Sequence, residues 1–363
     1  LLERNKIEIV HGTARLAGSG RVEVKGAEDK GRSQSLEAKS IILATGSEPV
    51  AVPGLEFDGK NIISSSEALQ LQTGPKQLGI VGGGYIGLEL GSVWRRLGAE
   101  VTVIEMLPQI VAALDGQVGR TLHRILKKQG FDFRLKTKVT GAKARAKKVT
   151  VTLGAGGKEE TLKFDKLLVA VGRRPLTRGL GLEEIGIETD AKTGMVIVNE
   201  KYQTNQPGIY AIGDLIAGPM LAHKASAEGT AAVEGIAGLP GEVNYDAIPA
   251  IIYTAPEVAS VGLTEEQVKQ REIPYRVGTY PFTGAGRARC LGETDGFAKV
   301  IAHKKTDRVL GVHVIGARAS EMIAECVLAV EFGASAEDIA RTVHGHPTFS
   351  EALMEAAMAA SGR

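Results

Sequence analysis

The segment from Gln77 to Glu105 constrains the fold more than any other part of the sequence. An apolar run enters a turn with glycine at positions 82, 84 and 87 and continues into a helical pattern. A second apolar run follows and ends at Glu105. Strand, glycine-rich turn, helix and strand in this order predict a βαβ unit.

Each glycine of this turn has a distinct physical role. Gly82 permits a tight turn, Gly84 lets the backbone approach a pyrophosphate, and Gly87 lets the helix pack closely on the strand. The free N–H groups and the positive dipole end of the helix then face the phosphates. Glu105 lies where an acid hydrogen-bonds the adenine ribose 2′-hydroxyl. Because a 2′-phosphate would meet like charge there, we predict a site for NAD rather than NADP; a turn without a ligand is the alternative.

Composition favours an α/β protein and gives no sign of a nucleic-acid or membrane partner. The 363 residues are enough for two or three domains. Aromatic residues make up 4% and glycine is abundant, with 46 residues, which suits a fold with many turns. The formal net charge is only +2, and no apolar run reaches the length of a bilayer span. The basic stretch 134–148 lacks interleaved aromatics, so we interpret it as a solvated hairpin face.

The two cysteines and the first residues bear on the compartment and on the chain's extent. Cys290 and Cys326 lie far apart, which favours a reducing compartment, the cytoplasm or, in a eukaryote, the mitochondrial matrix. We expect both to be small buried hydrophobes. The sequence starts at Leu1 without methionine, and charges interrupt any signal-peptide core, so we expect a truncated chain.

A repeated motif suggests two related nucleotide-binding domains, one nested in the other. Ala44-Thr45-Gly46 follows a predicted strand, and Ala170-Val171-Gly172 follows another in the same way. A later strand ends at Asp214, which either faces a ligand at the sheet edge or caps the next helix. Predicted strands in this part are 7–10, 13–16, 21–25, 40–43 and 131–135; predicted helices are 117–129 and 221–235; a hairpin is predicted over 149–168.

From about residue 246 the pattern changes to that of a separate α+β domain. Its last helices are rich in alanine and methionine, and pack either on another subunit or on the chain's own core. Predicted strands are 250–253, 298–302 and 309–315, and predicted helices are 264–270, 319–332, 335–342 and 350–360.

His346 and Glu351 form a candidate acid–base pair. Histidine titrates near neutrality, and a carboxylate that accepts one ring N–H fixes its tautomer and raises its basicity. Glu351 is close enough in sequence to do this across the turn at Pro347. A structural histidine and a metal ligand are the alternatives, but nothing nearby completes a ligand set, so no metal is predicted.

Together, these motifs resemble the flavin-dependent pyridine nucleotide-disulfide oxidoreductases over the whole chain. The resemblance implies an α/β fold with nested Rossmann-like domains for FAD and NAD, the former partial, and a C-terminal α+β dimerisation domain. The implied bounds are 1–75 and 176–245 for the partial FAD-binding domain, 76–175 for the NAD-binding domain, and 246–363 for the dimerisation domain.

The resemblance also implies a role for each matching residue. His346 would be the general base acting on a substrate dithiol, oriented by Glu351 and contributed across a homodimer interface to the partner's site. Asp214 would hold the ribitol chain of FAD. Glu89 would lie near the flavin and the nicotinamide. Tyr85 matches a position that can lie over the flavin, where the nicotinamide docks. The remaining implied cofactor-binding residues are Gly82, Gly84, Gly87, Glu105 and Gly172.

The ending His-x-His-Pro-Thr and the acid at position 105 favour the branch that oxidises protein-bound dihydrolipoamide and reduces NAD+ through FAD and a redox disulfide. The implied partners are lipoyl-bearing subunits of 2-oxo acid dehydrogenase or glycine cleavage complexes. The family's first glycine-rich unit and its cysteine pair are not in this sequence, so we expect the C-terminal portion of a longer enzyme, inactive when isolated. There are two alternatives. The first is a non-catalytic NAD-binding dimer, which a test for bound flavin would distinguish. The second is a sibling NAD(P)H-dependent disulfide reductase, which a comparison of NADH with NADPH as ligand would distinguish.

Overall fold

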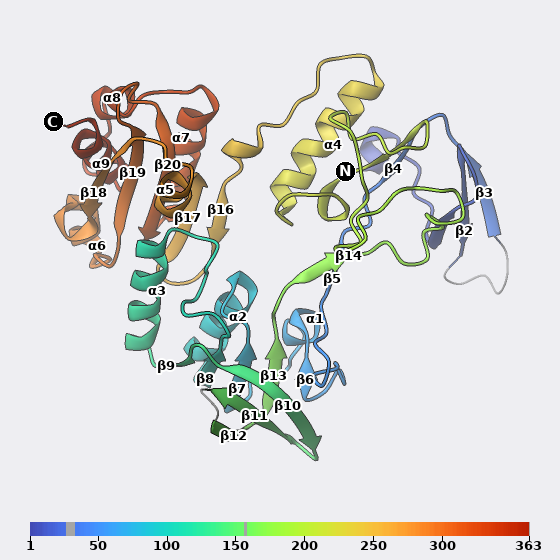
Figure 1. Cartoon of the computed structure of the whole chain (residues 1–363), viewed down its shortest axis with the longest axis horizontal. Helices are drawn as coiled ribbons and strands as arrows, with labels where there is room; N and C mark the ends of the chain where they lie inside the picture. Colours follow the sequence, from blue (N-terminus) through green and yellow to red (C-terminus); the bar gives the residue numbers. More distant parts are fainter. Residues whose placement is uncertain (27–32, 156–157, 363) are drawn as a thin grey trace. The chain divides into compact units, whose positions relative to one another are not determined.

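The computed structural model describes residues 1–26, 33–155 and 158–362, which divide into two compact units (Figure 1). Unit 1 contains residues 1–48 and 173–243, and unit 2 contains residues 49–172 and 244–363. Unit 2 therefore holds both the segment predicted to bind NAD and the segment predicted to dimerise. The predicted domain bounds themselves stay a prediction.

Unit 1 combines a small antiparallel sheet with a parallel strand pair. In the pair, Ile41 of β4 lies opposite Ile209 of β15. The elements are η1 (Glu3–Asn5), β1 (Thr13–Leu16), β2 (Arg21–Lys25), β3 (Ser33–Glu37), β4 (Ile41–Leu43), β15 (Ile209–Ala211), η2 (Gly213–Leu215) and α4 (Ala222–Ile236). The strand predicted at 7–10 is wrong: Ile7 and Ile9 stay about half exposed, because no sheet lies there for them to pack against.

The two repeated motifs lead into strands that pair with each other. β5 (Ser47–Pro49) follows Gly46, β14 (Arg173–Pro175) follows Gly172, and the two strands form a two-stranded sheet. The Arg173 guanidinium donates from Nη2 to the Ser47 carbonyl at 2.6 Å. Both glycines have positive φ, +74° and +138°, which a side chain rarely adopts. The repeat thus marks two places where the chain turns sharply between the units.

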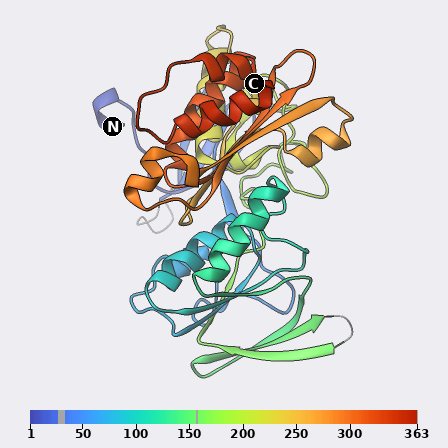
Figure 2. The same ribbon diagram turned by 90° about the vertical axis from the view of Figure 1, so that its left-hand side faces the viewer.

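The first half of unit 2 is a five-stranded parallel sheet in the order β6-β13-β7-β8-β9. Alternate side chains face opposite ways: Ile80 packs toward α2 and α3, and Val81 toward β11. Figure 2 shows these two helices on one side of the sheet and β10–β12 on the other. The elements are β6 (Ile62–Ile63), α1 (Ser65–Ala68), β7 (Gln77–Val81), α2 (Tyr85–Arg96), β8 (Glu100–Ile104), α3 (Gly116–Lys128), β9 (Phe131–Arg134) and β13 (Lys166–Val169).

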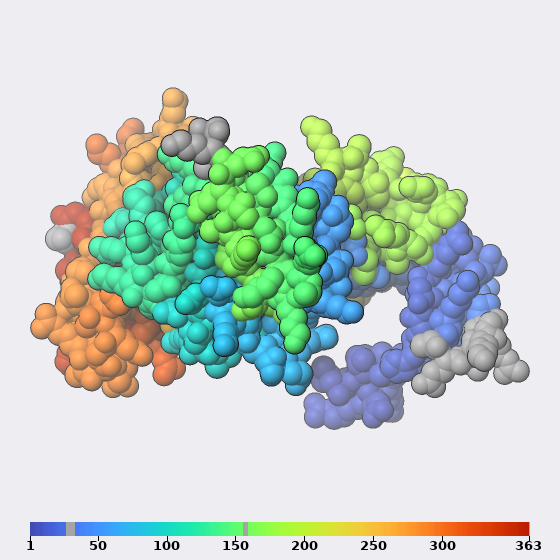
Figure 3. Space-filling view, turned by 90° about the horizontal axis from the view of Figure 1, so that it is seen from below, coloured from blue at the N-terminus to red at the C-terminus, as the bar shows by residue number. Residues whose placement is uncertain are grey.

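An antiparallel sheet of β10 (Lys138–Arg145), β11 (Lys148–Ala155) and β12 (Lys158–Phe164) covers this second face. The predicted hairpin ends at Phe164 rather than at residue 168, because β13 belongs to the parallel sheet. The basic residues of β10 are exposed, and Figure 3 shows these strands in green at the surface of unit 2.

The second half of unit 2 is an antiparallel sheet in the order β16-β17-β20-β19-β18 with helices packed on it. Strands β17 and β18 and helix α6 were not predicted. The elements are η3 (Tyr245–Ala247), β16 (Ala250–Ile252), β17 (Glu257–Gly262), α5 (Glu265–Gln270), β18 (Tyr275–Pro281), η4 (Phe282–Gly284), α6 (Gly286–Leu291), β19 (Phe297–His303), β20 (Val309–Gly316), α7 (Ala319–Glu331), α8 (Ala336–Arg341) and α9 (Glu351–Ser361). Within the described residues, no helix is long and apolar enough to cross a bilayer.

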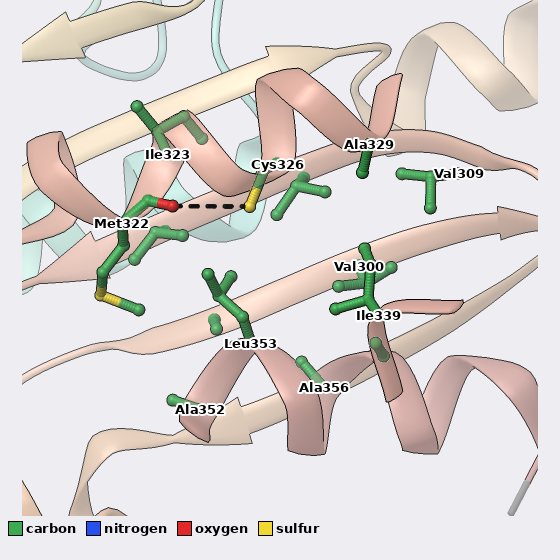
Figure 4. Close-up of a cluster of buried hydrophobic side chains, with 14 of the residues drawn as sticks. Val300, Val309, Met322, Ile323, Cys326, Ala329, Ile339, Ala352, Leu353 and Ala356 are labelled. Atoms are coloured by element: carbon green, nitrogen blue, oxygen red, sulfur yellow. Dashed lines mark hydrogen bonds between the residues drawn. The ribbon is translucent and has the colours of Figure 1, made fainter. Parts of the chain in front are cut away.

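The alanine-rich helix α9 packs its buried face on the chain's own core, and packing of the last helices on another subunit stays a prediction. Leu353 and Ala356 belong to the same buried cluster as Met322 and Cys326 of α7 (Figure 4). A Cβ on Gly278 of β18 would lie 2.0 Å from the Ala356 carbonyl oxygen, so glycine permits this close approach. Burial raises the pKa of the Cys326 thiol, as expected of a buried hydrophobe.

Cys290 departs from the prediction. It lies near the end of α6 and is exposed, whereas both cysteines were expected to be buried. α6 is a short helix whose buried side chain is Ala288, so it has little apolar surface with which to cover a neighbouring residue.

A buried ion cluster joins the two halves of unit 2. The Lys299 ammonium on β19, which is 1% exposed, lies 2.8 Å from Asp115 Oδ2 and 2.7 Å from Glu265 Oε2. Asp115 also caps α3 by accepting from the Gln117 N–H at 3.0 Å. Burial alone would raise the pKa of Glu265, but hydrogen bonds from Lys269 and Lys299 lower it to about 2. We call Asp115, Glu265 and Lys299 the Lys299 cluster.

We predict that Glu265→Gln removes stability that the wild type has above pH 4.5. A carboxylate whose pKa falls on folding stabilises the fold above its ordinary pKa, and that contribution disappears as the pH drops through the folded value. The difference in unfolding free energy between wild type and variant should therefore shrink between about pH 4.5 and pH 2. Urea titrations across this range measure it, and a difference that does not change with pH would contradict the assignment.

Candidate functional site

The glycine-rich turn between β7 and α2 has the close contacts that its sequence predicts. A Cβ on Gly82 would lie 2.4 Å from the Ala170 carbonyl oxygen, and its φ is +107°. A Cβ on Gly87 would lie 2.4 Å from the Gly82 carbonyl oxygen, so α2 packs directly on the turn. Gly84 differs, because no atom lies within 4 Å of the place where its Cβ would be. Two glycines are thus required by packing, and the third leaves open space at the start of α2.

That open space belongs to a cavity of about 640 Å³ at the carboxyl ends of the parallel strands. Its volume is in the range of small-molecule sites. The predicted residues Gly82, Gly84, Tyr85, Glu105 and Gly172 all line it. Gly87 and Glu89 are not among its lining residues.

Glu105 is fixed in the cavity wall by two backbone donors. Its Oε2 accepts from the Gly83 N–H at 2.7 Å, and its Oε1 accepts from the Leu107 N–H at 2.8 Å. A carboxylate offers about four acceptor positions, so further capacity remains for a hydroxyl group in the cavity.

Tyr85 and Glu89 lie one turn apart on α2. Burial raises the pKa of the Tyr85 hydroxyl to about 12, so the side chain is neutral at physiological pH. Burial also raises the pKa of Glu89, although the Tyr253 N–H donates to its Oε1 at 2.8 Å and opposes this rise. Glu89 thereby contacts the second half of unit 2, just after β16.

The cavity wall formed by residues 106–113, after Glu105, was not predicted from the sequence. Val111 lines the cavity, is 4% exposed and has a φ of +44°, which is a strained backbone for a β-branched residue. Such strain costs about 1–3 kcal/mol and is common at functional sites. Its N–H donates to the Gly83 carbonyl at 2.9 Å. No sequence signal marks Val111, because nothing in its residue type predicts a left-handed backbone.

Asp214 lies in unit 1, in the 3-10 turn η2 that follows β15. Its Oδ2 accepts from the Ser47 hydroxyl, which itself accepts from Arg173 Nε at 2.7 Å. The alternative that Asp214 caps the next helix is wrong, since α4 begins after Leu221 and has no side-chain cap.

A buried ion pair on α4 holds the backbone of this turn. Lys224 and Glu228, whose side chains are fully buried, lie 3.1 Å apart one turn along α4. Glu228 Oε2 accepts from the Gly213 N–H at 2.7 Å, and Lys224 Nζ donates to the Gly213 carbonyl at 2.9 Å. Both the N–H and the carbonyl of Gly213, the residue before Asp214, are therefore hydrogen-bonded to this ion pair.

The structure brings His346 and Glu351 together at the start of α9. His346 Nδ1 lies 2.8 Å from Glu351 Oε1, and Glu351 Oε2 accepts from the Thr348 N–H at 2.8 Å. The hydrogen bond with His346 lowers the pKa of Glu351, as does that from Thr348. The His346 side chain is 78% exposed, whereas that of His344 is 5% exposed and lies 2.6 Å from Glu325. His346 is thus the accessible histidine of this loop.

The predicted residues therefore lie in the cavity of unit 2, on α2 outside the cavity lining (Gly87 and Glu89), in the Asp214 turn of unit 1, and in the His346–Glu351 pair. Among the described residues, no group of three or more histidine, cysteine or acidic side chains could hold a metal ion.

Comparison with known families decides what these features belong to. Residues 1–229 match the pyridine nucleotide-disulphide oxidoreductase model, and residues 248–357 match the dimerisation domain of the same family. The chain belongs to this family. The predicted fold class, with FAD- and NAD-binding Rossmann-like domains and a C-terminal dimerisation domain, is confirmed.

Individual members of the family resemble the chain over its whole length. It is 53% identical to dihydrolipoyl dehydrogenase 3 of Pseudomonas putida, covering 100% of this chain and 77% of the relative. It is 49% identical to the mitochondrial dihydrolipoyl dehydrogenase of Cricetulus griseus, covering 99% and 71%. The crystal structure of LpdA from Mycobacterium tuberculosis has a TM-score of 0.91 at 25% identity, covering 99% of this chain and 78% of LpdA.

We predict that Gly87→Ala destabilises the protein and that Gly84→Ala does not. The added methyl at 87 would meet the Gly82 carbonyl, and such overpacking typically costs about 1–3 kcal/mol. The methyl at 84 would enter open space in the same turn, which makes this variant the matched control. Chemical denaturation measures both, and equal stabilities would contradict the packing role of Gly87.

Proposed function

We propose that the chain provides the NAD-binding and acid–base parts of a dihydrolipoyl dehydrogenase, which oxidises protein-bound dihydrolipoamide and reduces NAD+. The observation that carries this proposal is the His346–Glu351 pair: an exposed imidazole with one nitrogen held by a carboxylate. The names of relatives that are 48–53% identical support the same activity.

The pair has the arrangement of a general base. With Nδ1–H donated to Glu351, the neutral imidazole has its lone pair on Nε2, where it can take a proton from a thiol. The carboxylate then stabilises the imidazolium that forms. Because the ring is exposed, it is accessible to a second copy of the chain, and we propose a homodimer in which His346 serves the partner's site.

The cavity of unit 2 fits a dinucleotide. Open space at Gly84 allows a pyrophosphate to approach the α2 N–H groups, and Glu105 accepts from the ribose hydroxyl. In unit 1, Asp214 would hold the ribitol of FAD, beside Gly46, which also has no atom within 4 Å of its Cβ position. When bound, FAD and NAD+ supply the two-electron transfer that the side chains cannot perform. We assign Glu89 and Tyr85 to the surroundings of flavin and nicotinamide, and Gly172 to the wall of the NAD cavity.

The disulfide step is not assigned to residues of this chain. Cys326 is buried in the core and Cys290 is exposed on α6, and both are free. We propose lipoyl-bearing subunits of 2-oxo acid dehydrogenase or glycine cleavage complexes as partners. The two widely separated cysteines favour a reducing compartment: the cytoplasm or, in a eukaryote, the mitochondrial matrix. The names of several relatives describe those proteins as mitochondrial.

We predict that His346→Gln in the flavin-loaded, full-length gene product lowers dihydrolipoamide turnover by about 10²–10⁴-fold, the usual contribution of a general base. His303→Gln is the matched control, since His303 ends β19 and its ring Nδ1 is hydrogen-bonded to the nearby Thr306. Steady-state assays compare the two variants, with flavin absorbance as the check of integrity. Turnover near that of the wild type in His346→Gln would contradict the proposal.

We also predict that the wild type binds NADH at least tenfold more tightly than NADPH, on the order of 1.4 kcal/mol. Glu105→Gln removes the charge and keeps one acceptor oxygen, enough for only one of the Gly83 and Leu107 N–H groups. It should narrow the preference for NADH over NADPH mainly by removing the repulsion of the 2′-phosphate. Glu100→Gln, at the exposed start of β8, is the control. Fluorescence titration measures NADH and NADPH binding to the wild type and to each of the two variants, and a wild type that prefers NADPH would contradict the role of Glu105.

A further inference from the structure

The cavity wall contributed by residues 106–114, here called the wall segment, is anchored at its first end beside Glu105. Leu107 donates its N–H to Glu105 and accepts from the Lys136 N–H at 3.1 Å. The segment then supplies much of the cavity lining, contributed by Met106, Leu107, Gln109, Val111, Ala112 and Ala113. Its position therefore determines the shape of the proposed NAD site.

The middle of the wall segment is held in an unfavourable conformation. Val111 has a φ of +44° and donates its N–H to Gly83, in the glycine-rich turn itself. Leu114 donates back to the Val111 carbonyl at 2.9 Å. Because a β-branched residue avoids this backbone region, the contacts at both ends of the segment must impose it.

The second anchor comes from the other half of unit 2. Directly after the wall segment, Asp115 is fully buried, and its Oδ2 contacts Lys299 Nζ at 2.8 Å and the Glu265 N–H at 3.3 Å. The next residue, Gly116, donates its N–H to Glu266 Oε1 at 3.2 Å. The partners of this end thus lie on α5 and β19, in the segment that matches the dimerisation domain.

Lys299 is the only part of this anchor that neutralises charge on Asp115 among the ion pairs of the described residues. Without its ammonium, the buried Asp115 carboxylate would lose its cation, whereas the partly exposed Glu265 would keep its pair with Lys269. Asp115 would then move toward water and carry the end of the wall segment with it.

We propose that Lys299 is a positioning residue for the dinucleotide: from the dimerisation segment, it holds Asp115 and thereby the strained wall of the cavity. This inference rests on the proposed function, which assigns NAD to the cavity. Lys299 does not line the cavity, so it acts through the wall segment.

The test compares Lys299→Met with Lys269→Met in the flavin-loaded, full-length gene product. Lys269 pairs with the same Glu265 at 2.7 Å, but its side chain is 59% exposed and it has no contact with Asp115. We expect Lys299→Met to weaken NADH binding at least fivefold, and Lys269→Met to change it less than twofold. Asp115→Asn, which keeps an acceptor for the Gln117 N–H, should weaken binding in the same direction if Lys299→Met does not fold.

A second variant separates positioning from general loss of stability. Glycine adopts positive φ without steric cost, so Val111→Gly should restore part of the NADH affinity lost in Lys299→Met. Folded Lys299 and Asp115 variants with wild-type affinity would overturn the inference, as would equal losses with and without glycine at position 111. Failure of the wild type to bind NADH would instead overturn the proposed function, which keeps the two failures distinct.

Discussion

One buried ammonium group connects the half of unit 2 that contains the parallel sheet with the half that contains the sheet of β16–β20. Lys299 lies on β19 and contacts Asp115 at the start of α3, while α9 packs against the same antiparallel sheet. A charge buried this deeply persists only with compensating partners, and removing one partner of such a pair typically costs about 3–5 kcal/mol. These contacts therefore link the glycine-rich turn and the cavity wall to the helix that begins at Glu351, within one compact unit.

Much of the site could be predicted because its constraints are local. Gly87 is needed by its contact with the Gly82 carbonyl, within one strand–turn–helix unit, where the order of residues alone places those atoms close together. The positive φ of Gly82 is also a local requirement of the turn, although the carbonyl that its Cβ would meet belongs to the distant Ala170. The contact between His346 and Glu351 is also local, since five positions separate the two residues. Both could be read from spacing, although the chemical roles of these residues stay predictions.

The features that were missed depend on residues far apart in sequence. Asp115 and Lys299 are separated by 184 positions, and nothing near either residue indicates that its charge is buried. The alternation at residues 7–10 predicts a strand only where a sheet lies beside it, and the exposed Cys290 depends on how little of α6 is covered. Long-range burial, rather than local propensity, decides all three cases.

The division of unit 1 into two separate pieces of chain has a consequence for synthesis on the ribosome. Strand β4 ends at Leu43, but its parallel partner β15 begins at Ile209. At about 5–20 residues per second, β4 waits on the order of 10 s for that partner. During this time the nested residues 49–172 are already outside and able to collapse, whereas β4 presents an unpaired apolar edge. Nascent chains are therefore exposed to mispairing and to chaperone binding at β4 until β15 has been synthesised.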